Sequence, residues 1–449
     1  MGTPEGDSQP PPAPEASPGR TSSSTTPETP ARVGIPSPGP SFRGAIASRD
    51  FSLLWVGQFG SEAGNGLVQL ALPFLVLEIT GSAFQLAGAY VVQFLPWLLF
   101  GLIGGVLVDR WDRRMTIIVV EVIRAAAFLS VGLAFALDSS LLSVEIIYGL
   151  IFLESTLQNF FNPARLALMP NLVKAGDLRA ANSLMEVSRH IGFLVAPPAG
   201  LVLADLIGDS TIILADGVTF LISGITVFFI KWRQPRREVM QVEGWRDQLR
   251  QVIVETKEGI AVIRAVRLLQ VTILLGFCLN LVVAPIQTLL PLFVIDIKEQ
   301  TKTYFGLLGA AFIVGLIIGS LVAPAVARRI GLGRMTISSI FVLGTTIAVA
   351  AYLPTLWVPV VALVIAGTAI GSLNVAQINM LQTSTTDEER GRVSAAFYSA
   401  TLGVRTLGYF FAGALVAPIG VQPLFVVFGA FVLGVGFFIW RIPEVRDHK

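Results

Sequence analysis

Apolar segments of about 20 residues recur along almost the whole chain, and each is long enough to cross a hydrocarbon core roughly 30 Å thick. Hydrophobic residues make up 53% of the 449 residues and charged residues only 14%, whereas a soluble domain carries about 25% charged residues. These features predict an all-α polytopic membrane protein. Twelve membrane-spanning helices are predicted, over residues 52–79, 84–108, 115–137, 141–162, 181–205, 211–231, 266–296, 304–326, 335–354, 357–379, 394–417 and 422–441.

The composition argues against several functional classes. The net charge of +2 is too balanced for a nucleic-acid-binding surface. Cys278 is the only cysteine, so the chain can form no intramolecular disulfide or thiolate metal cluster, and its two histidines are too few for a histidine-rich metal site. The sequence has no Gly-rich phosphate loop and no nucleophile elbow. We therefore expect no enzyme activity, no metal and no cofactor.

The apolar segments divide the chain into four regions. Residues 1–41 are rich in Pro, Ser and Thr and are expected to form a disordered cytoplasmic tail that lacks the apolar core of a secretory leader. Two six-helix bundles are predicted, over 42–231 and over 265–449, the second ending in a short cytoplasmic tail. Apolar residues at helical spacing in the linker 232–264 predict an amphipathic helix on the inner membrane surface. The alternative for this linker is a solvated tether.

Basic residues determine the predicted orientation, because they are enriched in short cytoplasmic loops. Of the 32 Lys and Arg residues, only Lys298 and Lys302 fall in a predicted outer loop. Nearly all the others outside the helices lie in the opposite loops, in the linker or near the chain ends. Both termini are therefore predicted to be cytoplasmic.

The two bundles repeat each other in sequence. The segment ALPFLVLEI at 71–79 aligns with LLPLFVIDI at 289–297, proline on proline and acid on acid. In nearly the same register LLFG at 98–101 aligns with LIIG at 316–319, and RRMTI at 113–117 with GRMTI at 333–337. Three matches in nearly one register predict two parallel six-helix repeats, an architecture in which transporters bind substrate midway between the halves.

The loop after the second predicted helix reads GVLVDRWDRR. It resembles the major facilitator signature G-x-x-x-D-R-x-G-R-R, with Asp112 in place of the second glycine, as in the branch of drug and siderophore exporters of the macrolide and enterobactin type. The resemblance implies a cytoplasmic gate in which Asp109 meets a helix N-terminus and Arg113 pairs with acids on neighbouring helices. The alternative is simple positive-inside anchoring. The implied gate residues are Gly105, Asp109, Arg110, Arg113 and Arg114.

The fifth predicted helix contains GFLVAPPAG at 192–200. It resembles the antiporter motif G-x-x-x-G-P-x-x-G-G of the same superfamily, and the ALPF segment at 71–74 is similar to the proline motif of its drug exporters. Small residues allow close helix packing, and Pro197 is expected to kink the helix. The alternative is ordinary small-residue packing. The implied motif residues are Gly192, Ala196, Pro197 and Gly200.

Ionisable groups inside the predicted helices are the candidates for chemistry, because each is costly in the bilayer and tends to face the interior. Glu62 lies roughly 14 Å from the inner end of its helix at 1.5 Å per residue, among three glycines, and is the first candidate for proton coupling. Glu154 is the second. With Glu121, Arg124 and Arg189, which share the inner half of the bundle, Glu154 is interpreted as part of a buried charge network. The alternatives are a static ion-pair cluster and, for Glu62, a structural hydrogen bond.

Polar residues on other helices are candidates for the cavity wall, although they can equally bridge helices. Arg405 has no acidic neighbour within one turn and is expected to face the cavity or bind a substrate anion. Asp205 and Asp209, at outer helix ends, are expected to be solvated. The cavity candidates are Gln93, Gln158, Asn159, Asn374, Gln377 and Arg405.

These features together predict a secondary transporter in the cytoplasmic membrane. It is expected to export a small amphipathic molecule in exchange for protons by alternating access, and to act as a monomer. Its predicted partners are the substrate, protons and the lipid bilayer, without nucleic acid. The alternatives are a lysophospholipid or other lipid transporter of the same fold, and a membrane sensor that does not transport.

Overall fold

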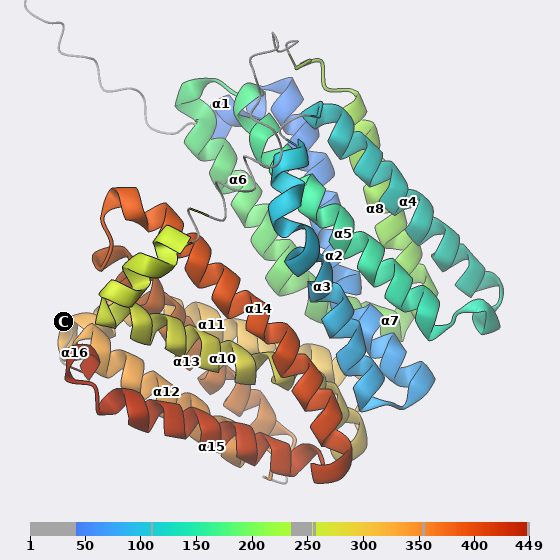
Figure 1. Cartoon of the computed structure of the whole chain (residues 1–449). Helices are drawn as coiled ribbons and strands as arrows, with labels where there is room; N and C mark the ends of the chain where they lie inside the picture. Colours follow the sequence, from blue (N-terminus) through green and yellow to red (C-terminus); the bar gives the residue numbers. More distant parts are fainter. Residues whose placement is uncertain (1–41, 109–110, 235–253, 255–256, 353–354, 447–449) are drawn as a thin grey trace, which may run out of the picture. The chain divides into compact units, whose positions relative to one another are not determined.

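The computed structural model describes residues 42–108, 111–234, 254, 257–352 and 355–446. The predicted disordered tail, most of the predicted amphipathic helix in the linker, and Asp109 and Arg110 lie outside these residues. Within them the chain forms helices and no strands (Figure 1). A short helix, α1 (Phe42–Ala47), precedes the first long one.

The helices of the first bundle follow one another with short connections. Ser48 caps α2 through its side chain, and Asp112 caps α4 in the same way, accepting from the backbone N–H of Met115 at 2.8 Å. This explains why an acid replaces the glycine of the signature: an N-cap side chain satisfies a free N–H of the helix. The bundle comprises α2 (Arg49–Thr80), α3 (Ala83–Val108), α4 (Arg113–Leu137), α5 (Val144–Leu168), α6 (Leu178–His190), α7 (Ala196–Ile207) and α8 (Asp209–Phe228).

The second bundle has the same order of long helices. Two of its connections are single glycines, Gly331 between α11 and α12 and Gly420 between α14 and α15, with φ of 88° and 87°. Gly208 joins α7 to α8 with the same φ of 87°, so the fifth and sixth spans of both halves meet at a residue in a conformation that favours glycine. The bundle comprises α10 (Arg267–Leu292), α11 (Lys302–Ile330), α12 (Leu332–Ala350), α13 (Trp357–Thr383), α14 (Asp387–Ile419), α15 (Val421–Trp440) and the short α16 (Pro443–Arg446).

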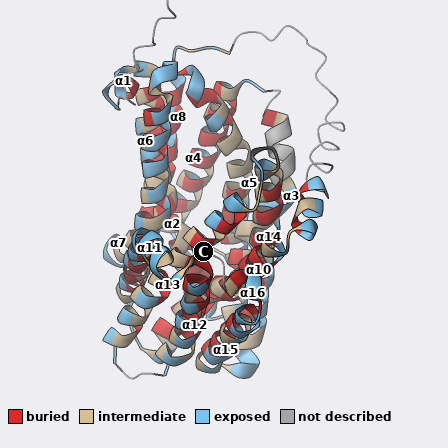
Figure 2. Ribbon diagram, turned by 90° about the vertical axis from the view of Figure 1, so that its left-hand side faces the viewer, coloured by how far each residue is buried: buried red, intermediate tan, exposed pale blue. Residues whose placement is uncertain are grey.

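Each of the twelve predicted spans corresponds to a helix or a helix pair in this arrangement. Ten helices in the described part of the chain are long and apolar enough to cross a membrane. The predicted spans outside this group are α5 and α14, which carry charged or amide side chains along their length. Both pack inside the assembly, α5 against α3 and α4, and α14 against α3 and α10. Buried residues lie mainly where helices face one another (Figure 2).

The fifth span differs from the single kinked helix that was predicted. It consists of α6, a π-helical turn at Ile191–Val195, and α7. Pro197 and Pro198 lie in the first turn of α7, and their missing N–H groups leave the carbonyls of the preceding turn without ordinary helical partners. A widened π turn before the prolines is the result.

Glycines form close backbone seams in both bundles. In the first, a Cβ on Gly66 would collide with the carbonyl oxygen of Gly192, and one on Gly200 with that of Leu67, so α2 and the fifth span touch along their backbones. In the second, α11 and α13 meet in the same way at Gly319 and Gly371. Such small-residue contacts are how helices associate in lipid, where no hydrophobic force drives them together.

The two bundles contact each other at the predicted outer ends of their helices. Lys302, predicted to lie in a loop, is instead the first residue of α11 and is only 8% exposed. Its ammonium lies 2.8 Å from Glu78 of α2 and 2.9 Å from Asp209 of α8. Asp205 accepts hydrogen bonds from the backbone and hydroxyl of Thr303. Asp205 is exposed, as expected, although it is also bonded to Thr303. The expectation that Asp209 is solvated was wrong, because its side chain is only 16% exposed and Lys302 of the second bundle supplies its donor.

Part of the linker packs on the second bundle. Residues 257–265 are helical, and Ile263 is buried with Leu381 and Val393 rather than left on a membrane-facing surface. Glu258 forms an ion pair with Arg392 of α14. This end of the linker is therefore held to α14 by both apolar and charged contacts.

Candidate functional site

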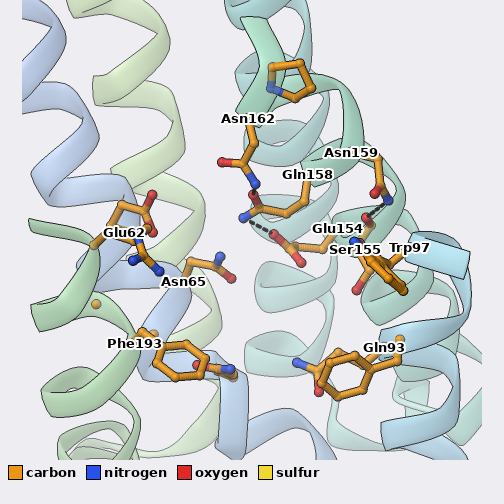
Figure 3. Close-up of a pocket in the computed structure, with 16 residues that line it drawn as sticks. Glu62, Asn65, Gln93, Trp97, Glu154, Ser155, Gln158, Asn159, Asn162 and Phe193 are labelled. Atoms are coloured by element: carbon orange, nitrogen blue, oxygen red, sulfur yellow. Dashed lines mark hydrogen bonds between the residues drawn. The ribbon is translucent and has the colours of Figure 1, made fainter. Parts of the chain in front are cut away.

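A cavity of about 500 Å³ opens inside the first bundle, between α2, α3, α5 and the π turn of the fifth span (Figure 3). Its wall combines two carboxylates, six amides and three large aromatic side chains. Such a lining can bind a molecule that has both apolar surface and hydrogen-bonding groups. These residues are Glu62, Glu154, Asn65, Gln69, Gln93, Gln158, Asn159, Asn162, Phe94, Trp97 and Phe193.

Helix α5 supplies a ladder of polar side chains along one face of the cavity. Asn162 donates to Gln158 at 3.0 Å, and Gln158 donates to Glu154 at 3.0 Å, each four residues apart (Figure 3). Residues at this spacing share a helix face. The ladder therefore aligns amides from the end of α5 toward the carboxylate of Glu154.

Glu62 lies across the cavity from this ladder and pairs with an arginine that the sequence analysis did not select. Arg165 Nη1 lies 3.0 Å from Glu62 Oε1, and its side chain is 7% exposed. The predicted helix ended at residue 162, which placed Arg165 in a cytoplasmic loop. The helix in fact continues through Pro163 to Leu168, and this extra turn brings the guanidinium inside.

Arg124 lies behind Glu154, away from the cavity, and is 1% exposed. Its Nη2 is 3.4 Å from Glu154 Oε1, and its guanidinium lies over the rings of Phe161 and Phe220. Glu121, one turn earlier on α4, is fully buried and accepts from Ser223 at 2.8 Å. Three members of the predicted charge network are therefore close together in the bundle.

Arg189 departs from that network. Its side chain is 43% exposed and pairs with Glu186 on the same helix at 2.6 Å. Arg189 lies in the last turn of α6, two residues before the π turn begins at Ile191, and it reaches the cavity rim rather than the buried cluster. Two buried residues that the sequence analysis missed take part instead: Gln58 of α2 and Asp216 of α8. The signal for Asp216 was a single acid in an otherwise apolar run.

The cavity candidates of the first bundle line the cavity, and those of the second bundle do not. Gln93, Gln158 and Asn159 line the cavity as expected. Arg405 does not: its guanidinium lies over the ring of Phe94 at 5.1 Å, where stacking between the two bundles holds it. Asn374 is exposed on α13 and Gln377 is half-buried there, and neither lines this cavity.

Among the described residues, Arg113 and Arg114 of the signature loop donate to backbone carbonyls, whereas Arg113 was expected to pair with acids. Arg113 donates to the carbonyl of Ala167 at 2.9 Å, at the end of α5. Arg114 is 4% exposed and donates to the carbonyls of Val227 and Phe228, at the end of α8. A cation at a helix C-terminus satisfies carbonyls that have no helical partner and complements the helix dipole. Gly105 lies within α3, while Asp109 and Arg110 are outside the described residues.

The antiporter-like motif forms the wall between the cavity and α2. A Cβ on Gly192 would collide with the backbone of Glu62, so this glycine fixes how closely the fifth span approaches the carboxylate-bearing turn. Ala196 and Pro197 are buried beside it, and Gly200 continues the seam against Leu67. No cluster of residues suited to a metal ion occurs in the searched part of the chain.

Comparison with known proteins agrees with this architecture. A family model described as transmembrane secretion effector matches residues 43–448. Macrolide efflux protein A of Streptococcus pyogenes is 27% identical over 399 residues, covering 88% of this chain and 96% of the relative. The multidrug efflux pump Tap of Mycolicibacterium fortuitum is 25% identical over 401 residues, covering 86% and 93%.

Solved structures share the fold. A bacterial homologue of the iron transporter ferroportin, in an inward-facing state, superposes with a TM-score of 0.66 at 18% identity, covering 87% of this chain and 98% of that one. A bacterial homologue of the lysosomal transporter Spinster, also inward-facing, gives 0.67 at 13% identity, covering 87% and 95%. The predicted fold of two six-helix repeats is therefore confirmed. With a family model that spans nearly the whole chain and a fold of known transporters, this chain belongs to the transmembrane secretion effector family of the major facilitator superfamily, and it is a membrane transporter, not an enzyme.

Proposed function

We propose that the protein exports a small amphipathic molecule across the cytoplasmic membrane in exchange for protons, by alternating access. One observation carries the proposal: two carboxylates, Glu62 and Glu154, line a single cavity inside the membrane-spanning region, and each faces a buried arginine. Ionisable residues at such depth are costly and mark ion or proton pathways. The relatives named as efflux proteins support the outward direction.

The cavity wall supports an amphipathic substrate. Phe94, Trp97 and Phe193 offer apolar surface, while six amides offer donors and acceptors. An acyl chain has no hydrogen-bonding groups, so its binding would remove water from these amides and leave them without hydrogen-bond partners, at a cost in free energy. The wall therefore favours a polar-decorated molecule, such as a macrolide, over the lipid alternative.

Coupling requires that a carboxyl be neutral in one state and charged in another. Glu62 meets this need because its counter-ion, Arg165, lies on a different helix and can separate from it when the helices shift. Protonation of Glu62 or approach of a cationic substrate would release Arg165, and each ligand would then favour one conformation. A ligand shifts a conformational equilibrium only through such differential contacts.

The test is transport in proteoliposomes that contain the purified protein, with a radiolabelled macrolide and an imposed pH gradient. We expect Glu62→Gln and Glu154→Gln to abolish uphill transport and to keep downhill exchange, because glutamine mimics the protonated acid. Glu145→Gln is the matched control, since Glu145 is exposed at the other end of α5. If both cavity variants keep gradient-driven transport, the coupling residue lies elsewhere or the protein is a uniporter. Accumulation of the macrolide by intact cells would contradict export.

The signature loop is proposed to act as the cytoplasmic gate, with the carboxylate of Asp109 stabilising the outward-facing arrangement. Asp109→Asn should then reduce macrolide transport severely while leaving expression near normal. Wild-type transport in this variant would reduce the loop to a topology signal.

The proposed orientation places both termini in the cytoplasm. In a variant whose native Cys278 is replaced by serine, cysteines at positions 140 and 300 should react with an impermeant reagent added to intact cells, whereas one at 111 should not. Ser140 and Trp111 are exposed and Gln300 is half-buried. Positions 140 and 300 lie at one end of the spans, and position 111 lies at the other. Labelling of position 111 from outside would overturn the orientation. The proposed monomeric state is testable by the mass of the detergent-purified protein.

A further inference from the structure

Three carboxylates share one arginine inside the first bundle. Glu121 and Asp216 are fully buried, Glu154 is 13% exposed, and Arg124 is 1% exposed. They come from three helices, α4, α8 and α5, and the carboxylate of Asp216 lies within electrostatic range of all the others. A dry site with three negative charges and one positive charge is strongly unfavourable. Some of these acids must therefore hold protons.

The hydrogen bonds around Glu121 are those of a charged carboxylate. Its Oε1 accepts from Ser223 at 2.8 Å, from Gln58 at 3.3 Å and from Ser61 at 3.4 Å. A buried anion needs several donors of this kind. Its Oε2, like Oδ2 of Asp216, has no hydrogen-bond partner. Three donors on Oε1, against one at Asp216, make Glu121 the better-stabilised anion of the two, and it lies one turn from Arg124 on the same helix.

The surroundings of Asp216 are those of a neutral acid. Its Oδ2 has no hydrogen-bond partner, and its Oδ1 has a single one, Thr219 Oγ1 at 3.1 Å. That hydroxyl also lies 2.8 Å from the carbonyl oxygen of Asp216. A threonine carries only one hydroxyl proton, which cannot serve both oxygens fully. A proton on Asp216 that is donated to Thr219, with Thr219 donating to the carbonyl, satisfies both contacts.

Arg124 is placed to change partners. Its Nε and Nη2 make no hydrogen bond, and the 3.4 Å contact with Glu154 is looser than a direct bond. The rings of Phe161 and Phe220, with centroids 4.9 and 5.3 Å from the guanidinium, hold the charge without fixing its donors. A buried guanidinium with unused donors among three acids can satisfy them by turning from one acid to another.

We propose that Asp216 is a second proton-holding residue of this transporter, loaded and unloaded through Glu154, with Arg124 as the counter-ion that changes partner. The inference rests on the proposed proton antiport, to which it adds a residue that does not line the cavity. The structure has Arg124 beside Glu154, and the proposal assigns the neutral form to Asp216 in this arrangement. When the proton leaves Asp216 and arrives on Glu154, Arg124 turns to the Asp216 carboxylate, and the total charge of the cluster does not change.

The other charged groups near this site do not replace these partners. On α2 the nearest is Glu62, which faces the cavity and is paired with Arg165. Gly64 of α2 covers the carboxyl instead, since a Cβ there would lie 2.5 Å from Asp216 Oδ1. On α7 the only acid, Asp205, is bonded to Thr303 at the outer end. Proton exchange therefore runs through α5, whose Glu154 is the member of the cluster that lines the cavity.

Infrared difference spectroscopy on the purified full chain, at neutral pH and without substrate, tests the assignment directly. We expect a C=O band of a protonated carboxyl in the wild type that is lost in Asp216→Asn. The control is Asp138→Asn, an exposed acid at the end of α4, which should keep the band. The apparent unfolding temperature of Asp216→Asn should stay close to that of the wild type, because asparagine resembles the neutral acid. If Asp216→Asn instead loses a band of an ionised carboxylate and keeps the C=O band of the protonated carboxyl, the proposal is overturned.

A second variant keeps the test decisive if Asp216→Asn does not fold. Thr219→Val removes the hydroxyl that Asp216 contacts, so it should shift the protonated band, whereas an ionised Asp216 has no such band to shift. Both readings are independent of transport. If wild-type proteoliposomes show no pH-driven movement of a macrolide, proton antiport fails while the spectra still decide the protonation of Asp216. If antiport holds, Asp216→Asn should lose driven transport and keep exchange, and retained driven transport would overturn its coupling role.

Discussion

The two bundles repeat each other in fold but differ in what they bury. In the first, the buried polar residues include Glu121, Arg124, Arg165 and Asp216. Among the described residues of the second, apart from Lys302 at the outer interface, they are all threonines. Three of these, Thr272, Thr336 and Thr401, donate to carbonyls of their own helices. The first bundle therefore holds the charge chemistry, and the second has an apolar interior.

The second bundle meets the cavity region through stacked rings and the cation–π contact of Arg405 with Phe94, rather than through ion pairs. Tyr409 of α14 stacks on Tyr90 and Phe94 of α3, with ring centroids 5.0 and 5.6 Å apart, and donates to Gln287. Flat stacked rings can slide with little loss of contact, whereas ion pairs hold one register. The described contacts between the bundles in this region are therefore ring contacts, whereas the ion pairs beside the cavity lie within the first bundle.

Removal of the central arginine should have the largest effect. Arg124→Gln leaves three acids without a cation, and breaking a buried ion pair costs about 3–5 kcal/mol. The matched change in the other bundle, Arg405→Gln, removes a half-buried arginine that has no acidic partner among the described side chains, so it should cost about 1 kcal/mol, the size of a cation–π contact. Unfolding of the purified proteins in detergent measures both. Equal losses would remove the distinction between the bundles.

The glycine seams should respond alike in both bundles, because they depend on packing and not on charge. Gly200→Ala and Gly319→Ala each place a methyl group on a facing carbonyl, and such overpacking costs about 1–3 kcal/mol. Gly149→Ala and Gly434→Ala are the controls, since a Cβ at either site meets nothing within 4 Å. Both controls should be neutral or slightly stabilising, and a loss as large as that of the seam variants would refute the packing explanation.

Buried hydroxyl groups test the same difference between the bundles, with an expected change of comparable size. Ser223→Ala removes a donor to Glu121 and an acceptor for Gln58, and a hydrogen bond to a charged group is worth about 1.5–3 kcal/mol. Thr272→Val removes a bond to the helix's own carbonyl, which keeps its backbone partner, and a weak contact with the Met380 sulfur, so stability should hardly change. Thermal unfolding of the two variants side by side provides the measurement. A larger loss for Thr272→Val would show that the second bundle also depends on buried polar bonds.

The smallest expected effect concerns the contact between the bundles at their outer ends. Lys302→Met breaks the pairs with Glu78 and Asp209, but both acids retain some exposure, so the loss should be about 1 kcal/mol or less. Because a factor of ten corresponds to about 1.4 kcal/mol, even this shift would populate an outward-open state several-fold more. Reaction of a cysteine at position 74 with an external reagent should rise in the variant. Unchanged reactivity would show that these ion pairs do not hold this end closed.

Much of the fold could be predicted because it depends on local properties. The apolar segments predicted the spans, and the aligned ALPF and LLPL segments predicted the repeat. The cavity was predicted in part: Glu62, Glu154, Gln93, Gln158 and Asn159 all line it. Their partners were not, since Arg165 lies one turn beyond the predicted end of its helix.

The sequence by itself determined that this chain crosses a membrane as helices, because in lipid each backbone group must be bonded within its own segment. Only the tertiary structure decided which charges meet, and it brought Glu121, Glu154 and Asp216 to one arginine while leaving Arg189 outside. The physical reason is that the lipid-facing side of a membrane helix is as apolar as its buried side. Hydrophobic periodicity therefore does not set the rotation of each helix, and packing against neighbouring helices does.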